Sequence, residues 1–196
     1  MGNLELILPE VFISLSIMFL LILGVFKKDS SKLIQNISLL VLLITAVITF
    51  NETLGVNEVT LFNGSIIVDY LSSFMKIITL IAAFLVLIIS SNYLNSLKIL
   101  KIEYPILILC SVLGMMIMIS SNDLIVFYMG LELQSLALYV LASFNRDQIK
   151  SSEAGLKYFV LSALSSGLLL YGCSLIYGFT GSTNFNVIAN ELNSNE

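Results

Sequence analysis

The chain has 196 residues, of which 58% are hydrophobic and only 11% are charged. A water-soluble domain carries about 25% charged residues, so these apolar side chains are too numerous to form the core of a soluble globule. The lipid bilayer is therefore the expected solvent for most of the surface. The net charge is −4 and the sequence has no basic patch, which excludes nucleic acid as a partner.

The composition also restricts metal and redox chemistry. The sequence contains no histidine, and its two cysteines, Cys110 and Cys173, lie in long apolar stretches. Free thiols in such surroundings pack as small hydrophobic side chains, and two isolated cysteines form neither an iron–sulfur nor a zinc site. We therefore expect no metal and no cofactor on this chain.

Six segments come close to the roughly 20 mostly apolar residues that a spanning helix needs. They are residues 4–26, 33–50, 68–90, 104–121, 124–144 and 154–178. A β-barrel is excluded, because the segments lack two-residue alternation and are about twice as long as a barrel strand. The sequence predicts an all-α integral membrane domain over residues 1–180 and a polar tail with one short amphipathic patch over residues 181–196.

The residues between the spans predict turns, helix caps and an orientation. SSND (120–123) is a tight turn that offers caps, and NRDQIKSSE (145–153) ends in a sequence that resembles a capping box. The three loops 27–32, 95–105 and 145–153 carry seven Lys and Arg residues, whereas the other exposed regions carry none. The positive-inside rule then places both termini on the outer side.

We take Lys76, Glu132 and Lys157 as the intramembrane ionisable set of the predicted spans. Glu132 lies about nine residues from the outer end of its span, or roughly 13 Å at 1.5 Å per residue, which is too deep for a glutamate to reach water. Lys76 lies at a similar depth, but its long stem could nearly reach the headgroups. Lys157 lies near the inner end, with Glu153 at i−4 on the same face.

Each of these residues has a structural and a functional interpretation. Glu132 and Lys76 could form a structural buried pair, and Lys157 could be an interface lysine paired with Glu153. In the functional interpretation, Glu132 accepts protons and a nearby lysine tunes its charge, because burial favours a neutral carboxyl and an ammonium favours the ionised form. Small polar residues of the same helices either line a wet path or hold helices together; they are Gln134, Ser135, Tyr139, Ser162, Ser165 and Ser166. For Ala163 and Gly167 we expect close packing.

Several motifs resemble one family. GLELQSL (130–136) and EAGLKYF (153–159), together with LPE near the start and DYLSSFMKI before the third span, resemble subunit 2, the N-type antiporter-like subunit, of respiratory complex I, the proton-pumping NADH:quinone oxidoreductase. The resemblance covers residues 1 to about 185. It implies that Glu132 is the key carboxylate of a proton route, that Lys157 takes part in proton transfer, and that Lys76 is a possible partner.

The resemblance also implies which partner subunits and which membrane surround the chain. FMN, the iron–sulfur clusters and quinone would lie on partner subunits, and this chain would be a non-redox, proton-translocating subunit beside other membrane-arm subunits. Family members have about fourteen helices, so we expect a second chain to supply helices 7 onward; a truncated gene and a fragment are the alternatives. The mitochondrial inner membrane is the expected location and a bacterial plasma membrane the alternative. Two rival functions are a subunit of a cation/proton antiporter and a structural scaffold that has lost transport.

Overall fold

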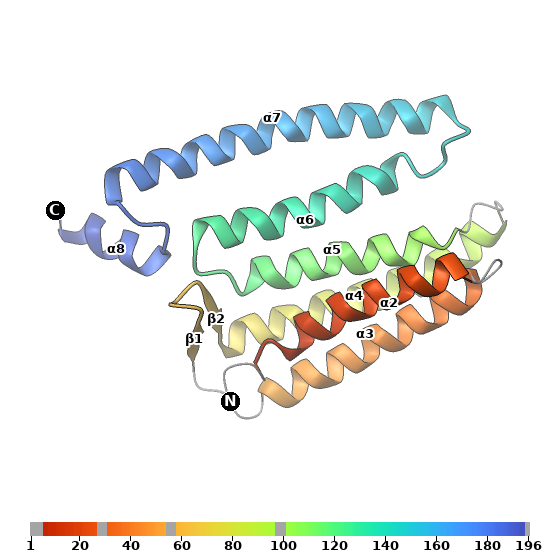
Figure 1. The fold of residues 1–196 in the computed structure, drawn as a ribbon, viewed down its shortest axis with the longest axis horizontal. Coiled ribbons are helices and arrows are strands. Elements are labelled where there is room, and N and C mark those ends of the chain that lie inside the picture. The colour runs from red at the N-terminus through yellow and green to blue at the C-terminus, as the bar shows by residue number, and fades with distance from the viewer. Residues whose placement is uncertain (1–5, 27–30, 54–57, 97–100, 195–196) are drawn as a thin grey trace.

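The computed structural model describes residues 6–26, 31–53, 58–96 and 101–194. Within these residues the elements are, in chain order, α2 (Leu8–Phe26), α3 (Ser31–Thr53), β1 (Val59–Leu61), β2 (Ile66–Val68), α4 (Tyr70–Ser96), α5 (Glu103–Ile119), α6 (Leu124–Ala142), α7 (Ile149–Thr180) and α8 (Phe185–Ser194). The six long helices, α2 to α7, lie roughly along one axis and alternate in direction (Figure 1). The predicted all-α membrane fold is confirmed, with one small hairpin added.

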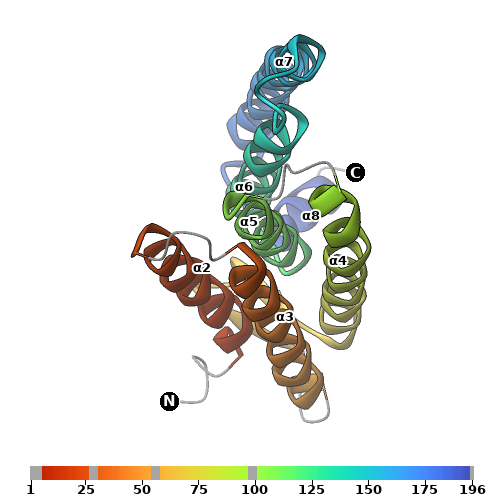
Figure 2. The same cartoon turned by 90° about the vertical axis from the view of Figure 1, so that its right-hand side faces the viewer.

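Five helices of the described residues are long and apolar enough to cross a membrane: α2, α3, α4, α6 and α7. The remaining predicted span, 104–121, forms α5, which has 17 residues and is therefore about 25 Å long. That length is less than the roughly 30 Å of a hydrocarbon core. Helix α5 lies in the centre of the bundle, with α2, α3, α4 and α6 around it (Figure 2).

Helices α5 and α6 pack closely against each other through two glycines. A Cβ atom on Gly114 would lie 2.6 Å from the backbone nitrogen of Gln134 and 2.7 Å from the carbonyl oxygen of Gly130. A Cβ atom on Gly130 would in turn lie 2.9 Å from the backbone nitrogen of Met118. Small residues permit this approach, and tight packing is the main force that joins helices inside a membrane.

Helix α7 lies at the edge of the bundle, beside α6 and away from α2 and α3 (Figure 2). At Gly155, near its start, α7 touches α6 closely, since a Cβ atom there would lie 2.4 Å from the Cβ of Ser143. The prediction that Ala163 and Gly167 form a close-packing face is wrong within the described residues. A Cβ atom on Gly167 would meet no neighbouring helix within 4 Å.

The helix caps agree with the sequence at one place and differ at another. Asp123 caps α6, because its carboxylate accepts a hydrogen bond of 2.8 Å from the backbone N–H of Ile125. The predicted capping box at residues 151–153 is not a helix start. Helix α7 begins at Ile149, about one turn earlier, after Gln148.

The hairpin, the turn before α6 and the segment before α8 dock on one another. Ile67 donates a backbone hydrogen bond of 2.8 Å to Ser120, and the side chain of Asn122 donates one of 2.8 Å to the carbonyl of Gly64. Asn184 reaches the same carbonyl, also at 2.8 Å. Residues 185–194, which the sequence assigned to a polar tail, thus form a helix whose start is bonded to the rest of the fold.

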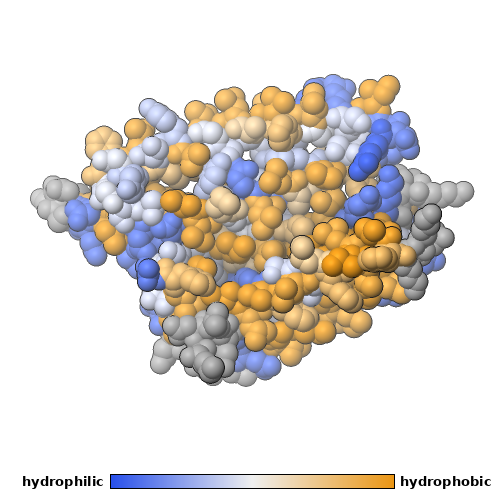
Figure 3. Space-filling view, in the orientation of Figure 1, coloured by the Kyte–Doolittle hydropathy of each residue, from blue (hydrophilic) through white to orange (hydrophobic). Residues whose placement is uncertain are grey.

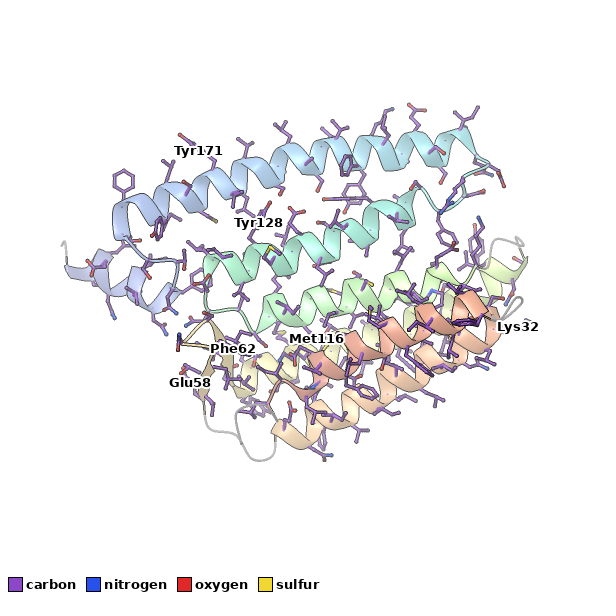
Figure 4. The ribbon with its side chains drawn as sticks, in the orientation of Figure 1. Lys32, Glu58, Phe62, Met116, Tyr128 and Tyr171 are labelled. Atoms are coloured by element: carbon purple, nitrogen blue, oxygen red, sulfur yellow. The ribbon has the colours of Figure 1, made fainter. Side chains whose placement is uncertain are left out.

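The two ends of the bundle differ in charge. Lys32 and Lys150, in the first turns of α3 and α7, and Lys101 and Arg146, in the segments between helices, lie at one end, which we call the inner end. The hairpin and α8 lie at the other, the outer end (Figure 1), and Figure 4 labels Lys32. Figure 3 shows an apolar surface over the middle of the helices and hydrophilic residues gathered toward both ends. The arrangement fits a spanning bundle, and its orientation in the membrane stays a prediction.

The glycine contact between α5 and α6 leads to a prediction about stability. Gly114→Ala should lower the free energy of unfolding by about 1–3 kcal/mol, because the added methyl group overlaps backbone atoms that cannot move aside. Gly167→Ala is the matched control, and it should leave stability equal or slightly higher, because alanine is the better helix former. Thermal unfolding of both variants in detergent micelles measures the difference; equal midpoints would contradict the packing.

Candidate functional site

The packing of α6 against α5 determines the direction in which the Glu132 side chain points. Successive residues of an α-helix are rotated by about 100°, so residues two apart lie on nearly opposite faces. Gly130 faces α5 at close range. Glu132 is therefore turned away from α5 toward α7, and its side chain is partly buried at that interface.

Hydroxyl groups hold the Glu132 carboxylate at the interface between α6 and α7. The Ser166 hydroxyl, on α7, donates a short hydrogen bond to Oε1 of Glu132. The hydroxyls of Tyr128 and Ser166 lie 2.9 Å apart, so Tyr128 belongs to the same network. Tyr128 lies between the two helices, whereas Tyr171 points away from the bundle (Figure 4). The carboxylate thus has polar partners where the sequence is otherwise apolar.

A second polar contact crosses the same interface nearer the inner end. The Tyr139 hydroxyl donates a hydrogen bond of 2.5 Å to Ser162, four residues before Ser166 on α7. The Tyr139 ring makes edge-to-face contacts with Tyr158 and Phe159. Tyr139 also lines a cavity of about 620 Å³ between α5, α6 and α7. That cavity includes Arg146 and therefore extends to the inner end.

Lys157 does not join the Glu132 network in this structure. Its ammonium lies 2.6 Å from the carboxylate of Glu153, and the lysine and glutamate side chains are 68% and 54% exposed. The predicted local pair is therefore confirmed. Nine residues of α7 separate Lys157 from Ser166, the serine that contacts Glu132, which is roughly 14 Å along the helix axis.

Lys76 pairs with a different carboxylate from the one expected. Its ammonium lies 2.6 Å from Oε1 of Glu10, and the two side chains are 2% and 12% exposed. The hypothesis of a Lys76–Glu132 pair is not supported, because Lys76 extends to the first turn of α2 while Glu132 faces α7. Equal depth on two helices does not bring two residues together when α5 lies between them.

The sequence did not single out two contributors, Glu10 and Tyr128. It named Ser166 only as one of several small polar residues of these helices. The sequence could have predicted a Glu10–Lys76 pair, because the predicted orientation places Glu10 at the same outer end that the long Lys76 side chain can reach. No pattern distinguished Ser166 from Ser165.

The comparisons with known proteins agree with this geometry. Residues 121–196, which contain both α6 and α7, match the family model described as "NADH:quinone oxidoreductase/Mrp antiporter, TM". The chain is 69% identical over 194 residues to NADH-quinone oxidoreductase subunit N of Pelagibacter ubique, covering 99% of this chain and 41% of the relative. It is 50% identical over 185 residues to subunit N of Paramagnetospirillum magneticum, covering 94% of this chain and 38% of the relative. The chain therefore spans about two fifths of the length of the curated relatives it matches.

Solved structures share the arrangement of helices. A chain of respiratory complex I from Thermus thermophilus with bound aureothin matches with a TM-score of 0.76 and 24% identity, over 94% of this chain and 42% of that one. A chain of the Mrp complex from Dietzia sp. matches with a TM-score of 0.69 and 20% identity, over 96% of this chain and 39% of that one. The chain therefore shares its helical fold with about two fifths of each of these membrane-complex chains.

The contact between Ser166 and Glu132 leads to a second prediction about stability. Ser166→Ala should destabilise the chain by about 0.6–2 kcal/mol, because the partly buried carboxylate loses its donor from α7. Ser165→Ala is the matched control, since the neighbouring serine is exposed. Unfolding in detergent measures both variants. An equal effect of the two would mean that the hydroxyl contact contributes nothing.

Proposed function

We propose that the chain is part of a membrane-arm subunit of NADH:quinone oxidoreductase and contributes to proton translocation. The observation that carries this proposal is Glu132, a carboxylate deep in an apolar helix that is held by a hydroxyl of α7 rather than by a permanent positive charge. Such a group can gain and lose a proton without breaking a buried ion pair, and intramembrane carboxylates commonly mark proton pathways. The identity to subunit N relatives supports the proposal.

The polar contacts support a path from the inner end. Protons would enter the cavity of about 620 Å³, which reaches Tyr139. The Tyr139–Ser162 contact lies about one turn of α7, or about 6 Å, from Ser166, a gap that one or two waters can bridge. From Ser166 the proton passes to Glu132. For these steps the chain supplies hydroxyls and carboxylates, between which O–H bonds break and form as the proton moves, and electron transfer would belong to partner subunits.

Lys157 would set the charge around this path. In the structure its ammonium is neutralised by Glu153. When that pair opens, the unpaired positive charge on α7 favours the ionised form of Glu132 at a distance, and when it closes the protonated form is favoured. A change of partner at the inner end can thus load and unload the carboxylate without moving a helix.

The proposal includes the partner subunits and the membrane in which the chain would lie. FMN, iron–sulfur clusters and quinone would belong to partner subunits. Further helices would cover α7, whose apolar face is largely exposed in the described residues. The chain is a multi-pass membrane protein. The relatives named above are bacterial, which favours the bacterial plasma membrane over the mitochondrial inner membrane that the sequence led us to expect first.

A second candidate function is a subunit of a cation/proton antiporter complex. The likeness to a chain of the Mrp complex favours it, as does the wording of the matching family model. An antiporter subunit would exchange cations for protons without a redox partner. A structural scaffold, the third candidate, would tolerate the loss of Glu132.

The decisive variants are Glu132→Gln and Lys157→Ala, made in the intact respiratory complex. Both should assemble normally, and quinone-coupled proton pumping should fall by roughly tenfold or more, because each removes a group that carries or biases the proton. Proton uptake and electron transfer are measured together in membrane vesicles.

Lys150→Gln is the matched control, since this exposed lysine lies on the first turn of the same helix. Normal pumping by assembled Glu132→Gln complexes would overturn the proposal and favour a scaffold. Cation-dependent proton exchange by the chain and its partners without quinone reduction would favour the antiporter.

A further inference from the structure

A tyrosine of α6 contacts the same serine that holds Glu132. Tyr128 lies four residues before Glu132, so the two side chains project from the same face of α6. Ser166 donates a hydrogen bond to Oε1 of Glu132, and its hydroxyl also lies 2.9 Å from that of Tyr128 (Figure 4). The proposed proton path reaches Glu132 through Ser166 and leaves Tyr128 without a role.

The contact between tyrosine and serine occurs twice along the interface of α6 and α7. Between residues 156 and 171 of α7, Ser162 and Ser166 are the two residues that are not exposed. Ser162 accepts a hydrogen bond of 2.5 Å from Tyr139, and Ser166 contacts Tyr128. The polar face of α7 thus meets a tyrosine of α6 at each of two successive turns.

The number of protons determines the direction of the hydrogen bonds around Ser166. A serine hydroxyl has one proton and two lone pairs, and an ionised carboxylate only accepts. Ser166 therefore uses its single proton on Glu132. The contact with Tyr128 then requires the phenol proton, so the tyrosine donates and the serine accepts, as in the Tyr139–Ser162 contact.

Donation from Tyr128 matters because a helical serine has another acceptor nearby. Serine and threonine hydroxyls often donate to the carbonyl four residues earlier, and Ser38 and Thr45 of α3 do so here at 2.8 and 2.7 Å. A tyrosine that occupies one lone pair of Ser166 turns the serine proton away from itself. It also strengthens the bond from Ser166 to Glu132, because hydrogen bonds in a chain polarise one another.

We propose that Tyr128 is a positioning residue for proton transfer: its hydroxyl donates to Ser166 and thereby directs the Ser166 proton to Glu132. The second lone pair of Ser166 stays free for an incoming proton. A hydronium ion gives its proton to that lone pair and becomes water, while the original O–H bond of Ser166 breaks and its proton binds Oε1 of Glu132. This inference rests on the proposed function and adds a residue to one of its steps.

Infrared spectroscopy of the full chain in lipid nanodiscs at neutral pH tests the hydrogen-bond chain, with ¹³C-labelled glutamate. The carboxylate band of Glu132 is the one that Glu132→Gln removes. Tyr128→Phe keeps the ring, and it should shift this band in the same direction as Ser166→Ala, because both variants weaken donation to the carboxylate. The double variant should shift the band no further than Ser166→Ala alone, because Tyr128 acts through the serine.

Tyr171→Phe is the matched control, since Tyr171 is exposed and points away from the bundle (Figure 4). This variant loses the same hydroxyl group and should leave the band in place. Incorporation of 3-fluorotyrosine at position 128 keeps the hydroxyl and makes it a stronger donor, so the band should shift the opposite way. That replacement tests the proposal even when Tyr128→Phe fails to fold.

A Glu132 band that neither change at position 128 moves would overturn the proposal. So would a protonated Glu132 carboxyl in the wild-type chain at neutral pH, because the hydrogen bonds would then run from Glu132 through Ser166 to Tyr128.

Proton pumping by the intact complex gives a second measurement. Tyr128→Phe should lower quinone-coupled pumping by about two- to tenfold, the factor that one hydrogen bond supplies, which is less than the effect of Glu132→Gln. Normal pumping by Tyr128→Phe would overturn the role of Tyr128 alone, whereas normal pumping by Glu132→Gln would overturn the proposed function itself.

Discussion

The close contact between α5 and α6 organises this structure. Inside a bilayer there is little hydrophobic force between helices, so association depends on packing and on polar contacts. Gly114 and Gly130 let the two backbones approach, and the short turn at residues 120–123 holds the helices antiparallel. The contact uses one face of α6. The opposite face, with Glu132, is left for α7, and so the glycines determine where the carboxylate points.

The buried acids of the bundle are stabilised in two different ways. Glu132 accepts a hydrogen bond from a hydroxyl, while Glu10 is paired with the ammonium of Lys76. A hydroxyl can bond to either protonation state of a carboxyl, whereas an ammonium strongly favours the ionised state. In the function we propose, a proton can therefore bind to and leave Glu132 without breaking an ion pair, whereas protonation of Glu10 would break its pair with Lys76.

The outer end is assembled from segments far apart in the sequence. The carbonyl of Gly64 accepts hydrogen bonds from Asn122 and Asn184, so the hairpin, the turn before α6 and the start of α8 share one anchor. The hairpin turn runs through positive φ at Phe62, Asn63 and Gly64, which leaves this carbonyl accessible. Ile66 and Val68 of the hairpin also line a mostly apolar cavity beside Glu10 and Lys76. A segment that looks like a simple connector thus takes part in the packing of the bundle.

The sequence by itself determined the membrane class, the approximate positions of the helices and the depth of Glu132, because hydropathy and helix rise depend only on local composition and length. It also determined the Lys157–Glu153 pair, which is set by the i,i+4 spacing of one helix. Only the tertiary structure decided that Lys76 meets Glu10 and that Glu132 meets Ser166. Which faces of different helices meet depends on packing at Gly114 and Gly130, and hydropathy carries no information about rotation around a helix axis when every face is apolar.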